Sequence, residues 1–446
     1  MKEVRKARIG FVSIAHADYL DDIVAEQTKL AIENIRMVGG EAIAVTDPVY
    51  DAKSAEAAGQ YLAGQRLDGV VLFLASWLEC PVFMSVLREV EHLPLCVQAF
   101  PMCIYKGKQE STGAYVSYSM IKGVLDRLKY SYTGILGSVD CDETREILGN
   151  FSAAARTVGQ LKRCRIGLVG YTSMSIYTGT FDHVFMRAKI GPEIEHIDNY
   201  SLIRMADAAT DAEREAVIDQ YRAHATIHSE VSDEFLKKSA GIYVAMEELV
   251  ETKDLAAINL KCQYEMSKEY KMVPCVPLSL LAETGCVASC EGDILNTVSM
   301  LMLHDLSGEV VTYGDSMNHT GNVLKLSSCG FNPFSMGVPG KQLIRNFMPH
   351  PGFTGIESSF VIRPGRVTVM RLIEDQCDYH IVYFTGEGLE TELRQGYMPA
   401  LDIRLDGRVE DLVDHYAGQH YAICFGDQSA KIELMAKMLG IRAIRI

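Results

Sequence analysis

The sequence has 446 residues, of which 48% are hydrophobic, and a formal net charge of −15. A chain of this length exceeds what one hydrophobic core usually serves, so two to three domains are expected. The negative charge argues against a protein that binds nucleic acid or an anionic membrane surface, because both tasks need a basic face. We therefore expect neither nucleic acid nor a membrane as a partner.

The N-terminal stretch, MKEVRKARIGFVSIAHADYL, has basic residues followed by only a short apolar run. A signal peptide would need a longer apolar core and a small-residue cleavage site. No run approaches the roughly 18 consecutive apolar residues that span a bilayer. The sequence therefore predicts a soluble, cytoplasmic protein.

The first 163 residues alternate strand and helix patterns. RIGFVSI (8–14) predicts a buried strand, and the helical pattern that follows closes at Gly39 and Gly40. The next patterns predict a strand, a helix, a buried strand, a helix and a strand: EAIAVT, SAEAAGQYLAGQ, DGVVLFLA, PVFMSVLREVEH and LPLCVQAF. Strands that are apolar on both faces and separated by helices are typical of a parallel sheet covered on both sides.

A long amphipathic stretch (142–163) leads to RIGLVGYTS (165–173), which repeats the pattern of the first strand and turn. We take this as the start of a second α/β domain, 164–308. It contains the predicted elements DEFLKKSAGIYVAMEELVE, LAAINLKC, PLSLLAETG and GDILNTVSMLMLHDLSG. Gly308 stands where a glycine commonly ends a helix.

From residue 309 the pattern changes to short β-rich runs separated by Gly, Asn and Pro: EVVTYGDSM, NVLKLSSCG, SFVIRP, RVTVMRLI and DYHIVYFTG. Such runs are typical of an antiparallel sheet or barrel. The last 26 residues return to strand, helix and strand. The predicted fold is two doubly wound α/β domains (1–163 and 164–308) followed by a β-rich, barrel-like domain (309–446).

Twelve cysteines are scattered along the chain without a regular framework. In a large cytoplasmic protein they are expected to be free, mostly buried thiols. Cys262, Cys275, Cys286 and Cys290 lie near one another in the sequence and offer a zinc site as the alternative. Their spacing fits none of the paired knuckles of structural zinc sites.

Motifs for nucleotide chemistry are absent: the chain has no GxxxxGK[ST] loop, and no GxGxxG follows the first strand. Two carboxylates stand at positions that suit chemistry instead. Glu291 begins an apolar helix pattern, and Asp315 ends a predicted strand. Each has an ordinary explanation, helix-dipole compensation for Glu291 and turn chemistry for Asp315. Together they offer carboxylate oxygens on different elements, as a hard divalent cation requires.

A histidine would complete a mixed oxygen and nitrogen site of the kind that suits Mn²⁺. His420 directly precedes the strand YAICF, where a rigid backbone could direct it into a cleft. His319 lies four residues after Asp315 and is a second candidate. Other roles are expected for the histidine of the apolar helix, the one in a Pro-flanked loop and the one in an exposed segment, which are His304, His350 and His415.

The C-terminal half resembles the L-fucose/L-arabinose isomerase superfamily, most closely its fucose isomerase branch. The resemblance rests on an ordered set of motifs: ASCEGDILNTVSMLML, GDSMNHTGNVLKLSSCGFNPFSMG, RPGRVTVMRL, FTGEGLE and GQHYAICFGD. Asp315 follows Glu291 by 24 residues, which matches the interval between the two carboxylate ligands of fucose isomerases. Upstream, LDRLKYSYTGILGSVD and AARTVGQLKRCRIGLVGYTS extend the resemblance over nearly the whole chain.

The resemblance implies a cytoplasmic aldose–ketose isomerase with three domains per subunit. Glu291, Asp315 and His420 would bind a divalent metal, with Mn²⁺ the expected ion, and Glu291 and Asp315 would share the proton transfer. The family assembles as homo-oligomers, here a trimer or hexamer, in which a neighbouring chain's first domain completes the sugar pocket. Trp77, at the end of a predicted strand, would face such a pocket or serve only in packing. His319 is the other expected substrate-binding residue.

Two positions depart from the family pattern. Ser328-Cys329-Gly330 replaces a His-Cys-Gly, and Gln419-His420 replaces a His-His pair while keeping its second member. These changes affect the expected identity of the substrate more than the expected binding of the metal.

The implied chemistry passes through an enediolate, whose developing charge a divalent ion stabilises while a carboxylate acts as general base. A metal-assisted hydride shift would need no base. The alternatives are an epimerase or lyase that acts on a sugar acid, sugar phosphate or sulfo-sugar, for which Arg345, Arg363 and Arg366 offer positive charge. A sugar-binding homologue without catalysis is a further alternative.

Overall fold

The computed structural model describes residues 4–19, 22–376 and 378–446. The chain forms two compact units. We call Arg5–Gln160 with Ala430–Gly440 the N-terminal unit, and Leu161–Ser429 with Met1–Val4 and Ile441–Ile446 the C-terminal unit.

The N-terminal unit is built on a parallel sheet of five strands in the order β2-β1-β3-β4-β7. All of β3 is buried, as is nearly all of β1, because helices cover both faces of the sheet. A small hairpin, β5 and β6, lies outside the sheet. The elements are β1 Arg8–Ile14, α1 Asp22–Met37, β2 Glu41–Ala44, α2 Ala52–Ala63, β3 Gly69–Leu74, α3 Cys80–Val90, β4 Leu95–Ala99, β5 Cys103–Tyr105, β6 Lys108–Glu110, α4 Ala114–Leu128, β7 Tyr132–Leu136 and α5 Asp142–Leu161.

The C-terminal helix α13, Ser429–Leu439, also packs in the N-terminal unit. Met438 contacts the core of this unit, and Lys437 Nζ donates to the Tyr132 carbonyl over 2.6 Å. The chain therefore enters this unit twice. The division into three domains at 163/164 and 308/309 stays a prediction.

The C-terminal unit begins with a second parallel sheet, of four strands in the order β12-β11-β8-β9. The helix that follows β12, α11, is buried almost throughout and ends at Gly308 with a φ of 75°, as the sequence predicts. The elements of this part are β8 Arg165–Val169, α6 His183–Lys189, β9 Glu193–Ile197, α7 Asn199–Ala208, α8 Asp211–His224, β10 Thr226–Ile227, α9 Asp233–Thr252, β11 Leu255–Leu260, a π-helix Glu265–Glu269, α10 Cys275–Ala282, β12 Val287–Cys290 and α11 Ile294–Ser307.

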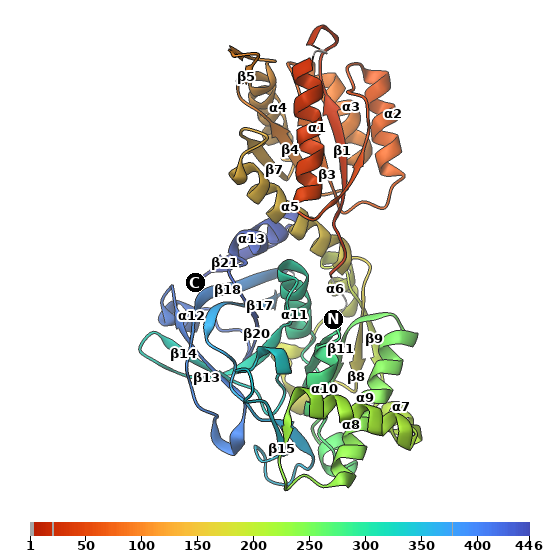
Figure 1. Cartoon of the computed structure of the whole chain (residues 1–446), viewed down its shortest axis with the longest axis vertical. Helices are drawn as coiled ribbons and strands as arrows, with labels where there is room; N and C mark the ends of the chain where they lie inside the picture. Colours follow the sequence, from red (N-terminus) through yellow and green to blue (C-terminus); the bar gives the residue numbers. More distant parts are fainter. Residues whose placement is uncertain (1–3, 20–21, 377) are drawn as a thin grey trace. The chain divides into compact units, whose positions relative to one another are not determined.

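The rest of the C-terminal unit contains an antiparallel barrel (Figure 1). The order β17-β20-β13-β14-β19-β18 closes on itself because β17 also pairs with β18, and β21 adds to β18 in parallel. Closure removes the exposed sheet edges. The elements are β13 Thr312–Thr320, β14 Val323–Ser327, β15 Leu343–Asn346, β16 Ile356–Ser358, β17 Gly365–Asp375, β18 Asp378–Leu389, β19 Ala400–Leu405, α12 Val409–Asp414, β20 His420–Phe425 and β21 Arg442–Arg445.

The predicted fold class is confirmed: two parallel α/β layers precede a β-rich, barrel-like part. One predicted strand, SFVIRP at 359–364, is displaced in the structure. The strand there is Ile356–Ser358, and Ile362 makes only an isolated bridge to Gly337. Pro364 has no N–H to continue a ladder.

No disulfide joins the eleven cysteines that the structure describes, as the sequence predicts, and Cys377 lies outside the described residues. The group of possible metal ligands found among the described residues contains no cysteine. Over the same residues, no helix is both long and apolar enough to cross a bilayer.

Candidate metal centre

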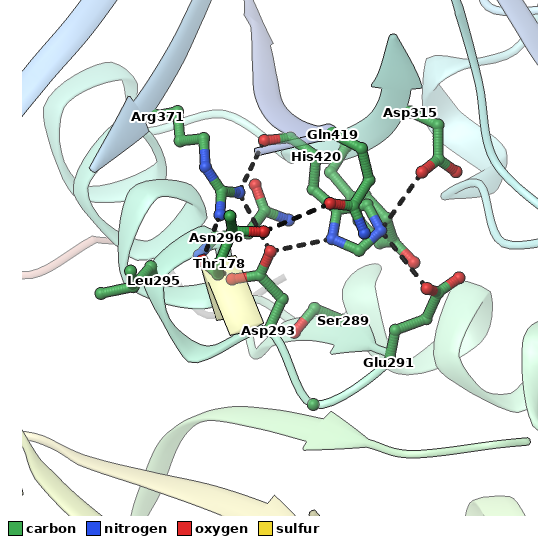
Figure 2. A network of polar contacts seen from close by, with 12 residues as sticks. Thr178, Ser289, Glu291, Asp293, Leu295, Asn296, Asp315, Arg371, Gln419 and His420 are labelled. Atoms are coloured by element: carbon green, nitrogen blue, oxygen red, sulfur yellow. Dashed lines mark hydrogen bonds and ion pairs between the residues drawn. The ribbon is translucent and has the colours of Figure 1, made fainter. Parts of the chain in front are cut away.

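Three side chains from separate elements of the C-terminal unit converge on one point. Glu291 follows β12, Asp315 lies in β13 and His420 begins β20. His420 Nε2 lies 3.4 Å from Glu291 Oε2 and 3.3 Å from Asp315 Oδ1 (Figure 2). One potential ligand atom from each residue lies within 4.8 Å of the other two. The structure thus brings together the three residues that the sequence nominates as metal ligands.

Barrel pairing places Asp315 beside His420. The two residues are direct partners in the antiparallel ladder between β13 and β20, so their side chains leave the same face of the sheet. On the other side of β13, the pairing with β14 shifts register at Met317. Bulges of this kind are frequent next to active sites, where they end regular pairing and redirect side chains.

Glu291 is held in an unusual backbone conformation. Its φ is 72°, in the left-handed region that residues other than glycine rarely adopt. The next residue, Gly292, also has a positive φ, and a Cβ there would lie 2.4 Å from the Tyr171 carbonyl oxygen. The Glu291 carbonyl accepts a hydrogen bond from Ser173 N over 2.8 Å. Gly292 is therefore required for the close approach that aims Glu291 at His420.

The other ring nitrogen of His420 is held by a buried carboxylate. His420 Nδ1 lies 2.9 Å from Asp293 Oδ2, so this nitrogen carries the proton and donates it. Asp293 is also the N-cap of α11, where its Oδ1 accepts from Asn296 N over 2.9 Å. One short helix start therefore supplies Glu291 and the residue that orients His420.

Arg371, in the middle of β17, balances the charge of Asp293. Its Nη1 donates to Asp293 Oδ2 over 3.0 Å and to the His420 carbonyl over 2.8 Å, and its Nη2 donates to the Thr178 carbonyl over 2.7 Å. The guanidinium and the Asp293 carboxylate are completely buried. Gly418 leaves the space for it, since a Cβ there would lie 2.5 Å from the guanidinium.

The environment moves the pKa values of the cluster apart. Burial raises the pKa of Asp315 to about 6, against the attraction of His420. Burial also opposes ionisation of Glu291 and Asp293. For Glu291, the attraction of the His420 ring exceeds the effect of burial and lowers the pKa of the carboxyl group. For Asp293, Arg371 and His420 together hold the pKa well below its usual range. The pKa of His420 is raised well above its usual value, because Asp293 and Glu291 outweigh burial.

The residues fit a divalent metal. His420 Nε2 is buried and has no hydrogen-bond partner, although buried polar atoms are normally paired. With a metal bound, the ring would keep its proton on Nδ1, toward Asp293, and offer Nε2 to the ion beside the two carboxylates. Two carboxylate oxygens and one imidazole nitrogen suit a hard or borderline cation such as Mn²⁺. The buried group could therefore bind a metal ion.

The remaining histidines nominated from the sequence lie outside this cluster. His319 is exposed near the hairpin turn, four residues along β13 from Asp315, which is roughly 13 Å of strand. His304 Nδ1 is 2.7 Å from the Glu309 carbonyl oxygen and His415 Nδ1 is 2.8 Å from that of Asp411. His350 Nε2 lies 3.3 Å from Cys329 Sγ, which is 3.8 Å from Glu291 Oε1.

Trp77 follows β3 in the N-terminal unit. Its ring meets the His16 ring edge-on at 5.3 Å, and 37% of its surface is exposed. Its backbone N–H donates to the Thr112 carbonyl over 2.7 Å. Its substrate-binding role, like that of His319, stays a prediction.

Sequence reasoning missed the orienting role of Asp293 and the presence of Arg371. A signal for Arg371 does exist, because VTVMRLI places one arginine in an otherwise apolar strand. A buried guanidinium needs a buried carboxylate, and nothing in the linear sequence says which one.

Sulfoquinovose isomerase of Alkalicoccus urumqiensis is 22% identical over 396 residues, which cover 85% of this chain and 89% of that protein. The proteins of the same name from Priestia aryabhattai and Priestia megaterium are each 21% identical over 395 residues, covering 85% of this chain and 86% of theirs. This chain is similar to sugar isomerases. The similarity extends over most of its length and agrees with the resemblance in the motifs.

No family model matches the chain. Among solved structures, a fatty acid ABC transporter substrate-binding protein from Thermomonospora curvata aligns with a TM-score of 0.17 at 12% identity, covering 58% of this chain and 57% of that one. At that score the likeness carries no argument.

Proposed function

We propose that this chain is a metal-dependent aldose–ketose isomerase in which Glu291, Asp315 and His420 hold the metal. The observation that carries the proposal is the convergence of these side chains, each of which offers one ligand atom within 4.8 Å of the other two. The relatives named sulfoquinovose isomerase support the reaction class. They also make sulfoquinovose, a hexose with a sulfonate, the first substrate to test.

A divalent ion bound there supplies a Lewis acid for the two adjacent sugar oxygens that exchange roles in the reaction. The protein contributes two carboxylates next to His420, Glu291 buried and Asp315 partly exposed. Isomerisation moves a proton between two neighbouring carbons, and a carboxylate beside them is a sufficient general base. Glu291 and Asp315 are the two carboxylates at this position, and we propose that they share metal ligation and the proton transfer. Glu291, whose backbone has a positive φ that aims its side chain at His420, is suited to fix the position of the metal.

A metal-dependent isomerase screen tests this function. The purified protein is stripped with chelator and assayed with and without Mn²⁺ against sulfoquinovose, L-fucose, D-arabinose and L-arabinose, with ketose formation as the readout. We expect turnover that requires the metal and falls at least 100-fold in Glu291→Gln. Incorporation of solvent deuterium into the product during turnover in ²H₂O would indicate the enediolate route, because a hydride shift carries the hydrogen across without exchange.

Product analysis in the same assay separates the isomerase from an epimerase or lyase. An epimer with no ketose, or two shorter carbon chains, would replace the isomerase assignment with one of those reactions. Metal binding without any turnover would favour a sugar-binding homologue.

A further inference from the structure

Two further histidines of the C-terminal unit face each other outside the candidate metal centre. His183 is the first residue of α6, and His196 lies in β9. Their Nε2 atoms are 2.5 Å apart, and the centroids of the two rings are 4.7 Å apart. Both residues are exposed. Thirteen positions separate them in the sequence, so no short ligand motif announces the pair.

The start of α6 holds His183 in place. Asp182 is the N-cap of this helix, and its Oδ1 accepts a hydrogen bond from Phe185 N over 2.7 Å. The Phe181 ring packs against the His183 ring with a centroid separation of 4.7 Å. A capped backbone and a ring contact therefore limit the orientations that the His183 imidazole can take.

The connection from α6 to β9 is fixed by polar contacts. Gly191 N donates to the Met186 carbonyl over 2.9 Å, and Arg187 Nη1 donates to the Gly191 carbonyl over 2.7 Å. Arg187 Nε also lies 3.2 Å from Glu193 Oε2, at the start of β9. His196 itself is paired with Leu168 in the parallel ladder between β8 and β9. The two imidazoles are therefore brought together by elements that are each tied down.

The state of protonation of this pair suits metal binding. A neutral imidazole has one N–H and one nitrogen with a lone pair, so the contact between the two Nε2 atoms needs at least one neutral ring. Partial burial, and then the neighbouring His183, lower the pKa of His196. His196 is therefore neutral at pH 7, and neutral imidazole is the form that binds metals.

A transition-metal ion fits between the two rings after a small movement. Imidazole nitrogens lie about 2.0–2.1 Å from Zn²⁺, so two of them on one ion are roughly 2.9–3.4 Å apart in square-planar or tetrahedral geometry. The Nε2 atoms, now 2.5 Å apart, must separate by less than about 1 Å. Rotation of two exposed side chains provides this, and each ring then carries its proton on Nδ1.

The donor atoms decide which ions such a site prefers. Imidazole suits zinc, copper and nickel, and affinity for nitrogen donors rises from Mn²⁺ toward Cu²⁺. The cluster at His420 differs, because it offers two carboxylates and one imidazole. Among the described residues, that cluster is the group of three or more possible ligands that converge, so water would fill the remaining positions on an ion at His183 and His196.

We propose that His183 and His196 form a second metal site, which binds a late first-row transition ion (Ni²⁺, Cu²⁺ or Zn²⁺) and fastens α6 to β9. Mn²⁺ binds there far more weakly, since the site offers no carboxylate. The inference does not depend on the proposed isomerase function, because neither histidine belongs to the cluster that carries it.

Counting bound ions tests the second site. The chelator-stripped protein is dialysed against Ni²⁺ at neutral pH, and the number of ions per chain is measured. We expect His183→Gln and His196→Gln each to bind one Ni²⁺ fewer than the wild type. His92→Gln, which removes an exposed histidine of the N-terminal unit, should bind as many as the wild type. Dialysis against Mn²⁺ should give the same count for all of these proteins.

Electron paramagnetic resonance of bound Cu²⁺ identifies the ligands directly. Glu291→Gln, loaded with one equivalent of Cu²⁺, should show couplings from two imidazole nitrogens, and the double variant E291Q/H183Q should lose them. Equal Ni²⁺ counts in the wild type and both histidine variants, or the same loss in His92→Gln, would overturn the site. A Cu²⁺ signal with one imidazole nitrogen in Glu291→Gln would also overturn it. A Mn²⁺ count that falls in His183→Gln would overturn the preference for late ions.

Discussion

His420 is the residue on which the site depends, because its two nitrogens face different partners. Nδ1 is held by Asp293, while Nε2 has only the two candidate ligand carboxylates near it. A carboxylate that accepts a hydrogen bond from one ring nitrogen of a metal-binding histidine fixes the ring orientation and the tautomer. It also makes the other ring nitrogen a stronger metal ligand. Asp293 therefore acts through His420 rather than on the substrate.

Replacing Asp293 with Asn should weaken metal binding by about 10- to 100-fold. Asn caps a helix about as well as Asp, so the start of α11 should survive the change. The measurement is a calorimetric titration of the metal-free protein with Mn²⁺. Asp198→Asn changes the same N-cap on α7, away from the site, and should bind Mn²⁺ like the wild type.

Loss of Asp293 also leaves Arg371 as a buried unpaired charge, which costs about 3–5 kcal/mol. The double variant D293N/R371M removes that charge. If Asp293 orients His420, metal binding stays weak in the double variant. Recovery of wild-type affinity would show that the unpaired arginine, and not the histidine, caused the loss.

At the scale of elements, β15 and β16 carry a second unusual carboxyl group. Glu357 is fully buried in β16, opposite Arg345 in the ladder, and neither of its carboxylate oxygens has a hydrogen-bond partner. Burial raises its pKa to about 9 despite the attraction of Arg345. The side chain is therefore protonated in the folded protein at neutral pH.

A carboxyl group whose pKa is higher in the folded than in the unfolded state makes stability fall as pH rises between the two values. For Glu357 this window runs from about 4.3, the unfolded value, to about 9. Glu357→Gln should therefore change little at pH 4.5 and raise the free energy of unfolding by about 4 kcal/mol at pH 8.

Urea unfolding of the wild type and Glu357→Gln at several pH values checks this expectation. Glu309→Gln, an exposed glutamate in the same unit, serves as the control. A difference between the wild type and Glu357→Gln that does not vary with pH would contradict it.

At the scale of the whole molecule, the two compact units should respond differently to metal. A ligand that binds only the folded state, present at 100 times its Kd, stabilises by about 2.7 kcal/mol. All three candidate ligands belong to the C-terminal unit, so Mn²⁺ should stabilise that unit.

Hydrogen exchange with and without Mn²⁺ resolves the effect by element. Amide protection should rise in β13, β20 and α11 and stay constant in β1, β3 and β4. Equal protection of all six elements would mean that metal binding is not confined to the C-terminal unit. In Glu291→Gln the rise should be largely lost.

Local sequence patterns were enough for the order of the elements and the fold class. Continuous apolar runs bounded by polar residues and glycines mark elements that are buried on all sides, so β1, β3 and α11 could be predicted without knowledge of their partners. The ligand residues were nominated from their types, spacing and resemblance to a family. The displaced strand near Pro364 shows where local signals end, because extended residues become a strand only if a neighbour pairs with them.

Only the tertiary structure decided how the site is built. Its parts come from the start of α11, from β13, from β17 and from β20, and the barrel register alone places Asp315 opposite His420. The links of Arg371 to Asp293 and of His350 to Glu291 through Cys329 join residues far apart in the chain. The linear sequence shows which polar and charged groups need partners. Long-range packing determines which partner each of these groups has.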